Sequence, residues 1–321
     1  MSYNSRLGHT LVIANPASHS GKGAAGAETV RRFLDIYESA TSGYDLKLTE
    51  HSCDAQRMAQ DASAYDTVIV LGGDGVIHEA VNGLMTIDAA QRPRMGVIPL
   101  GSGNDYARTQ GLTLNNPDRS LAELLAGTER SFDVGYVSSD ACPEGAYFAE
   151  TLSFGLDAAI ALDTTTRRAE GTKQEGAGLF ATSSIKLFSR AQAGHPCVVR
   201  FDDEEPISLS SLIFAVQNGP TYGGGFRICP KADPTDGLLD VCYNVRHPWV
   251  PVLLVLLGMA RFGLHTGSRA VRLRTARHID IEFTEGEPPC QVDGEELRGS
   301  RFSVEVEHNA RRVIVPPANR W

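Results

Sequence analysis

The stretch Val70-Leu-Gly-Gly-Asp-Gly-Val-Ile-His-Glu79 decides the fold of this chain. Residues Thr67 to Leu71 are apolar and largely β-branched, which is typical of a strand buried on both faces. Gly72 and Gly73 carry no side chains, so backbone N–H groups at the start of the following helix can approach a phosphate group. Asp74 would repel phosphate unless a magnesium ion lay between them. The alternative is a plain strand-to-helix turn in which Asp74 caps the helix.

A second strand and glycine turn follow further along the chain. Met95 to Leu100 has the composition of a buried strand, and Gly101-Ser-Gly-Asn-Asp-Tyr-Ala-Arg108 then opens a helix. Because ligands of open α/β sheets bind at the carboxyl ends of parallel strands, both turns are expected at one site. Ser102 could donate a hydrogen bond to phosphate, with Asn104 and Asp105 as helix caps. Asn104 and Asp105 could equally be ordinary caps without a ligand.

The hydrophobic pattern changes part-way along the chain. Up to about residue 127 strands alternate with helices, which predicts a parallel sheet flanked by helices. Later strands are separated mainly by turn residues, which predicts an antiparallel β-sandwich. We therefore expect a Rossmann-like α/β domain over residues 1–130 and a β-sandwich domain over residues 131–306, with residues 307–321 packing back on the first. A cleft between the two domains is the expected active site.

The expected elements have the following bounds. The first part has strands at Leu11–Asn15 and Tyr44–Thr49, in addition to the two above, and helices at Gly23–Tyr37 and Ala55–Ala64. The second part has helices at Leu156–Arg168 and Leu179–Ala191. Its strands are expected at Phe132–Val137, Tyr147–Phe154, Cys197–Phe201, Leu209–Gln217, Leu238–Tyr243, Ala270–Arg274, His278–Phe283, Phe302–Val306 and Val313–Val315.

Composition narrows the classes of partner. The formal net charge of −9 argues against nucleic acid and against global attraction to an anionic membrane, so any membrane contact must be local. The six cysteines lack metal-type spacing, and the first ten residues lack an apolar signal core, so we expect buried thiols and a cytoplasmic protein. Trp249 to Ala260 is shorter than the roughly 20 residues of a spanning helix, so it is either packed between layers or interfacial. The sequence does not decide whether two copies of the chain form a homodimer.

The string Gly21-Lys-Gly-Ala-Ala-Gly26 imitates a dinucleotide-binding fingerprint. It begins several residues beyond the expected strand, whereas the fingerprint needs its first glycine in the tight turn itself. It is not a Walker A loop either, because Gly23 stands where serine or threonine is required. The fingerprint interpretation is therefore disfavoured.

Taken together, the motifs resemble the catalytic domain of diacylglycerol kinases and related lipid kinases, including bacterial soluble ones. The resemblance covers roughly residues 10 to 315 and rests on six motifs in the family's order. They are Gly72-Gly-Asp-Gly75 with Glu79, Pro99 to Arg108, Glu150 to Ala158, Gln217-Asn-Gly with Gly223 to Gly225, Pro230 to Asp240, and Val292-Asp-Gly-Glu295.

The resemblance implies an ATP-dependent lipid kinase that uses Mg2+ and meets its lipid at a membrane surface. It implies that Asp74 and Glu295 are catalytic, Glu295 as the general base. It places Asn15, Thr49, Gly72, Gly73, Asp74, Gly75, Glu79, Ser102 and Asn104 near the nucleotide, with Lys22 as either a phosphate contact or a solvated lysine. It also implies a magnesium site away from the chemistry at Asp233, Asp236 and the Leu238 carbonyl.

Local sequence leaves a plainer alternative at several of these positions. Thr49 could be an exposed residue at a strand end, and Glu79 could either orient Asn104 or a ribose or merely favour the helix dipole. Asp236-Gly and Asp293-Gly-Glu295 could be ordinary hairpin turns.

Two other functions compete with the lipid kinase. NAD kinase shares the glycine turn and a two-domain plan, but its Asn-Glu signature is not found here. A non-catalytic lipid- or nucleotide-binding regulator is the second, because the family usually has threonine at the position of Val76. Losing one hydroxyl hydrogen bond costs on the order of 1 kcal/mol, which weakens nucleotide binding without abolishing it.

Overall fold

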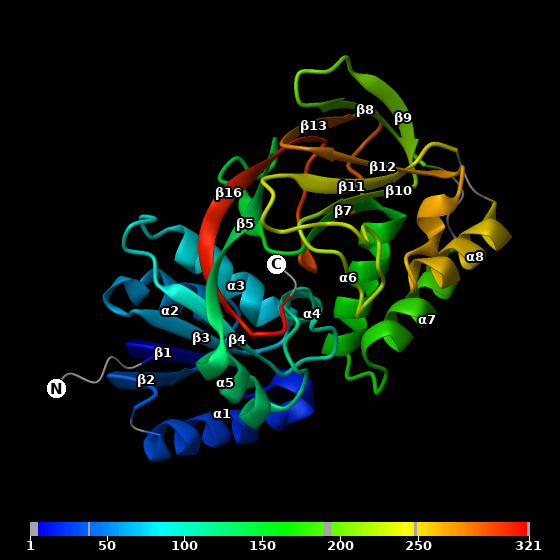
Figure 1. Cartoon of the computed structure of the whole chain (residues 1–321). Helices are drawn as coiled ribbons and strands as arrows, with labels where there is room; N and C mark the ends of the chain where they lie inside the picture. Colours follow the sequence, from blue (N-terminus) through cyan, green and yellow to red (C-terminus); the bar gives the residue numbers. More distant parts are fainter. Residues whose placement is uncertain (1–5, 38, 189–193, 247–248, 320–321) are drawn as a thin grey trace. The chain divides into compact units, whose positions relative to one another are not determined.

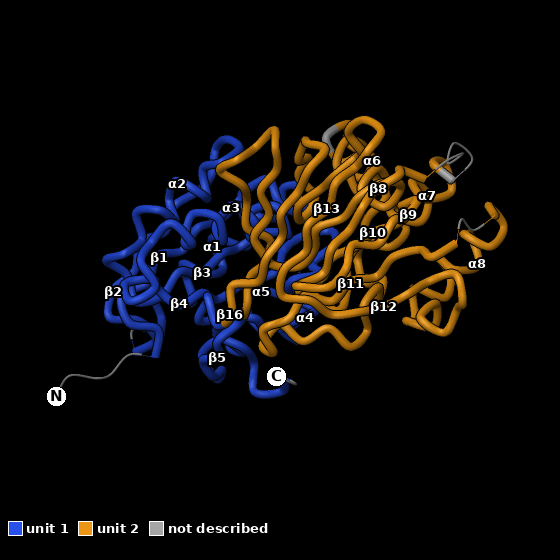
Figure 2. Tube along the Cα trace, turned by 90° about the horizontal axis from the view of Figure 1, so that it is seen from above, with its two compact units in different colours: residues 1–132, 309–321 blue, residues 133–308 orange. Residues whose placement is uncertain are grey.

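The computed structural model describes residues 6–37, 39–188, 194–246 and 249–319 (Figure 1). It divides into two compact units, which Figure 2 colours separately: residues 1–132 with 309–321 form unit 1, and residues 133–308 form unit 2. Strands β5 (Thr128–Ser139) and β16 (Arg301–Val315) each continue from one unit into the other. Among the described helices, none combines the length and apolar character that crossing a bilayer requires.

Unit 1 is built around a parallel sheet with the strand order β2–β1–β3–β4. The strands are β1 (His9–Ala14), β2 (Gly43–Leu48), β3 (Thr67–Gly72) and β4 (Arg94–Pro99). The end of β16 extends the sheet beside β4, where Val313 lies opposite Met95 in parallel. Every residue of β3 is buried, as its continuous apolar sequence predicts for a strand covered on both faces.

Helices cover both faces of this sheet, α1 and α5 on one and α2 and α3 on the other (Figure 1). They are α1 (Ser18–Ile36), α2 (Asp54–Gln60), α3 (Asp74–Met85), α4 (Asp105–Gln110) and α5 (Pro117–Ala126). The predicted helix Ala55–Ala64 is shorter than expected, because a 3-10 turn at Ala62–Ala64 replaces its end. The expected parallel sheet flanked by helices is confirmed.

Unit 2 is an antiparallel sandwich with a layer of helices. One sheet has the order β12–β11–β10–β7–β14–β15, and the facing sheet contains β9–β8–β13–β16, with β5 and β6 continuing beyond β16. The strands are β6 (Ala146–Phe148), β7 (Thr151–Gly155), β8 (His195–Phe201), β9 (Ile207–Ser211), β10 (Ile213–Gln217), β11 (Leu239–Asn244), β12 (Val271–Ala276), β13 (His278–Phe283), β14 (Cys290–Val292) and β15 (Glu295–Glu296). The predicted sandwich is confirmed.

Alternation along the strands separates two cores in unit 2. Phe214 on β10 faces the core between the sheets, where Phe154 of β7 packs edge-on against Phe302 of β16 with ring centroids 4.8 Å apart. Ala215, the next residue on β10, faces the opposite core beneath the helices. Those helices are α6 (Leu156–Ala169), α7 (Gly176–Phe188) and α8 (Val250–Ala260), followed by the 3-10 helix η2 (Leu264–Gly267). The predicted end of α7 at residues 189–191 lies outside the described residues.

Three strand predictions need correction. The predicted strand Tyr147–Phe154 breaks between β6 and β7, because the Ala149 and Glu150 N–H groups donate to the Asp293 carboxylate instead of a neighbouring strand.

The predicted strand Leu209–Gln217 also breaks, at Leu212, whose N–H donates to the Asn244 side chain where the chain passes between sheets. The predicted strands at 302–306 and 313–315 instead form one strand, β16, in which Asn309 adopts a left-handed φ of 54°. Each of these differences occurs where the strand leaves one set of partners for another.

Candidate active site

Four loops of unit 1 come together at the carboxyl edge of its parallel sheet. The Asn15 N–H donates to the Leu71 carbonyl at 3.0 Å, which joins the loop after β1 to the end of β3. The Leu100 N–H donates to the Gly72 carbonyl at 2.8 Å, and the Thr49 N–H donates to the Ala14 carbonyl at 2.9 Å. The structure therefore brings the predicted nucleotide-binding loops to one edge, where open α/β sheets bind their ligands.

The two glycine turns touch each other through their backbones. A Cβ atom placed on Gly101 would lie 2.5 Å from the Gly73 Cα, so Gly101 has no room for a side chain, whereas a Cβ atom on Gly73 would make a tight contact of 3.3 Å with the Gly101 Cα. A Cβ atom on Gly72 would overlap the Val76 side chain, which is buried. Gly72 and Gly101 are thus required for packing.

Gly75 differs from the other glycines of the turn. It is the second residue of α3, and a Cβ atom built on it would meet no atom within 4 Å. Its lack of a side chain is therefore not explained by packing within the protein. A helix N-terminus with a bare backbone is suited to a phosphate group, so Gly75 is the glycine that best fits the expected nucleotide contact.

Asp74 connects the two turns. It is the first residue of α3, and its Oδ1 accepts a hydrogen bond at 3.3 Å from the Tyr106 N–H, in the first turn of α4. A Cβ atom on Gly103 would lie 2.6 Å from the Asp74 Oδ2, so the second turn closes tightly over this carboxylate. Asp74 therefore caps a helix, as the plainer alternative proposed. The capped helix is α4, which follows the second glycine turn, and not α3, to which Asp74 belongs.

The prediction that the Asn104 side chain caps α4 is wrong. Asn104 is the N-cap residue, but its left-handed φ of 56° turns its side chain back to its own loop. There its Nδ2 donates to the Gly101 carbonyl at 2.8 Å and to the Asn115 Oδ1 at 3.2 Å. Asp105 is already the first helical residue. The capping acceptor is supplied by Asp74 instead.

The carbonyl oxygen of Asn104 is the polar atom here that best fits a ligand. Asn104 is buried, and its Oδ1 has no hydrogen-bond partner among the described residues. Leaving a buried acceptor unsatisfied costs about 1–3 kcal/mol. Asn104 and Asp74 both offer oxygen atoms, which hard cations such as Mg2+ prefer. The residues present therefore fit a magnesium-bound nucleotide.

Glu79 has a role that the sequence did not predict. Its Oε1 accepts from the Cys53 N–H at 3.0 Å, and its Oε2 accepts from the Ala55 N–H at 3.2 Å. Both carboxylate oxygens thus hold the start of α2 and complement its dipole. The structure gives no contact between Glu79 and Asn104, whose side chain bonds to Gly101 and Asn115.

The remaining predicted nucleotide residues lie in the same loops. The Asn15 Oδ1 accepts from the Ala17 N–H at 2.9 Å, which fixes the turn before α1. Thr49 is buried, so the alternative of an exposed threonine at a strand end is wrong. Ser102 is half-buried in the second glycine turn, and Lys22 is exposed at the start of regular helix in α1.

The loop after β1 also explains the string that imitates a dinucleotide fingerprint. His19, Ser20 and Gly21 all have left-handed φ angles, so regular helix begins only after them. A Cβ atom on Gly23 would overlap the Asn15 carbonyl oxygen. Gly23 is therefore required for contact between helix and loop.

In unit 2, Glu295 follows a tightly anchored turn. Asp293 and Gly294 both have positive φ angles, 48° and 99°, as a two-residue type I′ hairpin requires. The Asp293 carboxylate accepts from three successive N–H groups, those of Ala149, Glu150 and Thr151, at 2.7–3.1 Å. The turn is a hairpin, as the plainer alternative held, and it presents Glu295 exposed on β15.

The predicted magnesium loop of unit 2 is strongly acidic. The Asp233 Oδ1 accepts from the Thr235 N–H at 3.0 Å, and the Asp236 Oδ1 accepts from the Leu238 N–H at 2.9 Å. Burial, with Asp233 and Asp133 nearby, raises the pKa of Asp236. Within the described ranges no group of three or more His, Cys, Asp or Glu side chains forms a metal site, so a site here would need backbone oxygen as well.

Asp133 ties this loop to β16. Its Oδ2 accepts from the Gly237 N–H at 2.7 Å, and its Oδ1 lies 2.8 Å from the Nδ1 of His308. Because Asp133 is fully buried, these contacts hold the carboxylate-rich turn in place.

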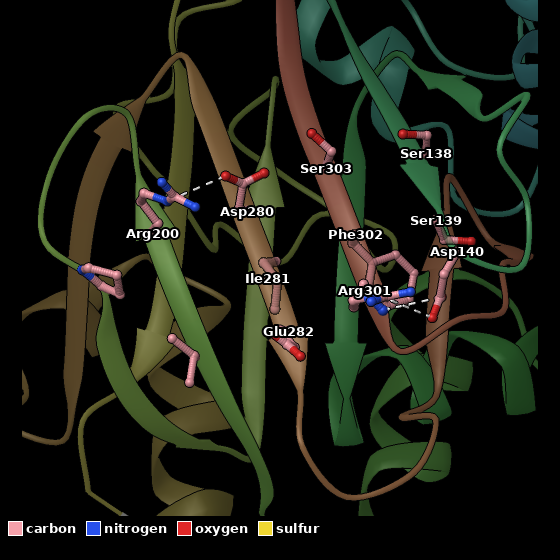
Figure 3. Close-up of a pocket in the computed structure, with 12 residues that line it drawn as sticks. Ser138, Ser139, Asp140, Arg200, Asp280, Ile281, Glu282, Arg301, Phe302 and Ser303 are labelled. Atoms are coloured by element: carbon pink, nitrogen blue, oxygen red, sulfur yellow. Dashed lines mark hydrogen bonds and ion pairs between the residues drawn. The ribbon is translucent and has the colours of Figure 1, made fainter.

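Two hollows in unit 2 contain none of the predicted site residues. One, of about 470 Å³, lies on the face of the β8–β13–β16 sheet (Figure 3). Four of its charged side chains form two ion pairs, Arg200 with Asp280 at 3.5 Å and Arg301 with Asp140 at 3.7 Å. The other, of about 70 Å³, is an apolar pocket bounded by α6, α7 and α8.

One buried carboxyl lines the apolar pocket. Asp157 is 3% exposed, and burial raises its pKa to about 7. It lies near the thiol of Cys242, whose pKa burial raises to about 12. All six cysteines are free, and four of them are buried.

Comparison with known proteins places the chain in a family. Residues 9–137 match the diacylglycerol kinase catalytic domain, and residues 150–315 match the YegS C-terminal NAD kinase beta sandwich-like domain. A protein of Pseudomonas aeruginosa named "Probable lipid kinase YegS-like" is 30% identical over 91% of each chain. One of the same name from Yersinia enterocolitica is 29% identical over 96% of this chain and 97% of its own.

Solved structures show the same fold. A diacylglycerol kinase from Bacillus anthracis str. Sterne has a TM-score of 0.72 at 20% identity, with 97% of each chain covered. An NAD kinase from Archaeoglobus fulgidus in complex with ATP has a TM-score of 0.54 at 14% identity, covering 98% of this chain and 95% of its own. The chain therefore belongs to the YegS-like lipid kinase family, with a diacylglycerol kinase catalytic domain followed by a YegS-type β-sandwich domain.

Proposed function

We propose that this protein is an ATP-dependent kinase that transfers the γ-phosphate of ATP to a lipid hydroxyl, such as that of diacylglycerol. The observation that carries the proposal is the backbone contact between Gly73 and Gly101, beside the start of α3. Two glycine turns in contact at one sheet edge form a surface of N–H groups suited to a polyphosphate. Membership of a lipid kinase family supports the same conclusion.

On this proposal the first unit binds and orients the nucleotide. The open backbone at Gly75 would contact the phosphates, and Asp74 and Asn104 would supply oxygen atoms to a bound Mg2+. Mg2+, when bound, neutralises charge on the β and γ phosphates. Asn15, Thr49 and Ser102 lie in the same group of loops and would contact the rest of the nucleotide. Catalysis would depend mainly on positioning and charge stabilisation.

We propose Glu295 as the general base. It is an exposed carboxylate in a turn fixed by Asp293, so its backbone is held while its side chain can meet a substrate. A lipid hydroxyl has a very high pKa, so the base accepts its proton late, as the bond to phosphorus forms. Asp233, Asp236 and the Leu238 carbonyl are proposed to hold a second Mg2+ whose role is structural.

The substrate is tested by supplying labelled ATP and Mg2+ together with a total lipid extract, diacylglycerol or NAD. Transfer of label to a lipid supports the proposal, and the product identifies the lipid. Transfer of label to NAD alone would instead assign an NAD kinase-like activity. NAD is included because the fold is similar to that of an NAD kinase. If the protein binds nucleotide but phosphorylates no acceptor, its function would be that of a non-catalytic regulator. We place the activity in the cytoplasm, at the inner face of the membrane.

The roles of two carboxylates are tested by amide substitution. Asp74→Asn and Glu295→Gln are expected to lower the rate of transfer about a hundredfold or more, while unfolding stays within about 0.5 kcal/mol. Glu296→Gln is the matched control, because Glu296 is the exposed neighbour of Glu295 on β15. A Glu295→Gln enzyme as fast as Glu296→Gln would refute the base assignment.

A further inference from the structure

Helix α8 is apolar on both of its faces. Leu253, Leu256 and Ala260 are buried in the core beneath the helices of unit 2. On other sides of the same helix, Val252 and Val255 are 40% and 61% exposed. A surface helix ordinarily carries polar residues on its outer face, so these apolar residues need a separate explanation.

The exposed apolar surface continues beyond both ends of the helix. Trp249 precedes α8 and is 77% exposed, and Phe262 follows it and is 71% exposed. We name as the α8 patch the exposed apolar side chains Trp249, Val252, Leu254, Val255, Phe262 and Leu264. Most of the large, exposed apolar side chains in the described ranges belong to it. Single exposed apolar residues are normal, but a gathered set marks an interaction surface.

The segments that flank the α8 patch in the sequence carry positive charge. Between Asp240 and Asp280 the chain has six arginines and neither aspartate nor glutamate, although its net charge is −9. Exposed Arg246, Arg261 and Arg269 lie in the segments on either side of α8 and η2. Arg227 is exposed too, and its N–H donates to the Ala260 carbonyl at 2.9 Å, which places it at the end of α8.

The charge of the segments beside the α8 patch and the length of α8 distinguish between three partners: a second copy of the chain, a bilayer interior and a bilayer surface. A second copy packed by two-fold symmetry through this patch would bring two sets of these arginines into one interface, and the segment has no acidic residue to pair with them. A helix of 11 residues cannot cross a bilayer. An anionic bilayer surface offers both an apolar boundary and negative charge.

We propose that the α8 patch docks the protein on an anionic lipid bilayer, with its apolar side chains in the interface and the nearby arginines at lipid phosphates. In Figures 1 and 2 α8 lies at the periphery of unit 2. The inference deepens the proposed function, because it supplies the membrane contact by which a kinase would reach a lipid substrate. The docking itself requires no catalysis.

The test is co-sedimentation with vesicles in the absence of ATP. Wild-type protein is expected to bind vesicles of phosphatidylcholine containing about one third phosphatidylglycerol, and to bind pure phosphatidylcholine at least tenfold more weakly. Added salt should weaken binding to the anionic vesicles, because it screens the arginines.

Two sets of variants divide the apolar and charged contributions. The triple variant Trp249→Gln, Val255→Gln, Phe262→Gln should lower the vesicle partition coefficient at least tenfold. Arg246→Gln with Arg269→Gln should lower it about tenfold at low salt and weaken the salt dependence, because other exposed arginines remain beside the patch. The matched control is Ile36→Gln with Leu48→Gln, two exposed apolar residues of unit 1, which should bind as wild type does.

Three results would overturn the proposal. They are a wild-type protein that does not bind anionic vesicles, a triple variant that binds as tightly as the control, and a wild-type dimer that becomes monomeric in the triple variant. The last would make the α8 patch a contact between copies. Circular dichroism of the triple variant confirms that its fold is intact, since all three side chains are exposed.

Failure of docking is distinguishable from failure of the proposed function. A water-soluble short-chain diacylglycerol is phosphorylated without a bilayer, so the triple variant should act on it at the wild-type rate. The same variant should lose at least tenfold of its activity on diacylglycerol in anionic vesicles. If the wild-type protein binds vesicles but phosphorylates neither lipid, the docking surface is supported and the proposed kinase function is refuted.

Discussion

Replacing Gly75 by alanine separates two roles of glycine in the nucleotide turn. An added Cβ atom would meet no protein atom within 4 Å, and Gly75 is not among the glycines with positive φ. The variant therefore has no clash and no backbone strain. Gly→Ala at such a position stabilises by about 0.4–1 kcal/mol, because the unfolded chain loses freedom. The melting temperature should then rise by roughly 1–4 °C.

The same substitution should weaken ATP binding. If the phosphates approach the N–H groups at the start of α3, the new methyl group takes up the space beside them. Overpacking costs about 1–3 kcal/mol, which raises the Kd for ATP roughly five- to 150-fold. Gly75→Ala is thus expected to be more stable and to bind ATP more weakly.

Calorimetric titration with ATP and Mg2+, together with thermal unfolding, measures both effects. Gly101→Ala is the comparison variant, because its Cβ atom would lie 2.5 Å from the Gly73 Cα and should lower stability as well as binding. A Gly75→Ala protein with an unchanged Kd for ATP would show that the phosphates do not run over this part of α3. A loss of stability in Gly75→Ala would contradict the open space at that position.

Three further predictions address other parts of the chain. Burial raises the pKa of Asp157 from 3.8 to about 7. The folded protein therefore binds this proton more tightly than the unfolded chain, and the free energy of unfolding falls as pH rises from about 4 to about 7. Urea unfolding should show that Asp157→Asn stabilises the protein by about 3 kcal/mol more at about pH 8 than at about pH 5, and an equal effect at both would refute the shift. Val76→Thr restores the family's hydroxyl and should lower the Kd for ATP several-fold, for about 1 kcal/mol; no change would place that hydroxyl away from phosphate. Asp293→Ala removes three backbone hydrogen bonds and should cost about 3 kcal/mol in urea unfolding, whereas exposed Glu296→Ala should stay within about 0.5 kcal/mol.

The glycine turns could be predicted because their signals are local. A continuous apolar run specifies β3 without knowledge of its neighbours, and the glycines that end it specify the turn. The same is true of β4 and the turn at Gly101. Because both strands are parallel members of one sheet, adjacency of the turns follows from topology alone.

The roles of individual carboxylates could not be predicted in the same way. Asp74 caps α4 through Tyr106, 32 positions away, and Glu79 holds the start of α2 from 24 and 26 positions away. Helix capping is normally sought within three residues of a helix start. A carboxylate that reaches a helix from another element leaves no local pattern, so the sequence suggested ligand or dipole roles, or for Asp74 a cap on its own helix.

The breaks in predicted strands have a related cause. The chain around Ala149 and Leu212 is apolar enough to continue a strand, and periodicity alone favours that continuation. In the structure, the Asp293 and Asn244 side chains accept the backbone N–H groups there and end the ladder. Such a partner is distant in sequence, so the break becomes visible only when the fold brings the side chain to the backbone.

This use of carboxylates in the structure affects how their chemistry can be tested. The Asp74 Oδ1 accepts the Tyr106 N–H, so alanine at this position would remove a helix cap together with the charge that a cation requires. Asparagine keeps one oxygen acceptor for the Tyr106 N–H and replaces the other, charged oxygen by a neutral NH2 group. A loss of phosphate transfer in Asp74→Asn with unchanged unfolding therefore reports the charge, whereas the same loss in Asp74→Ala would not separate charge from fold.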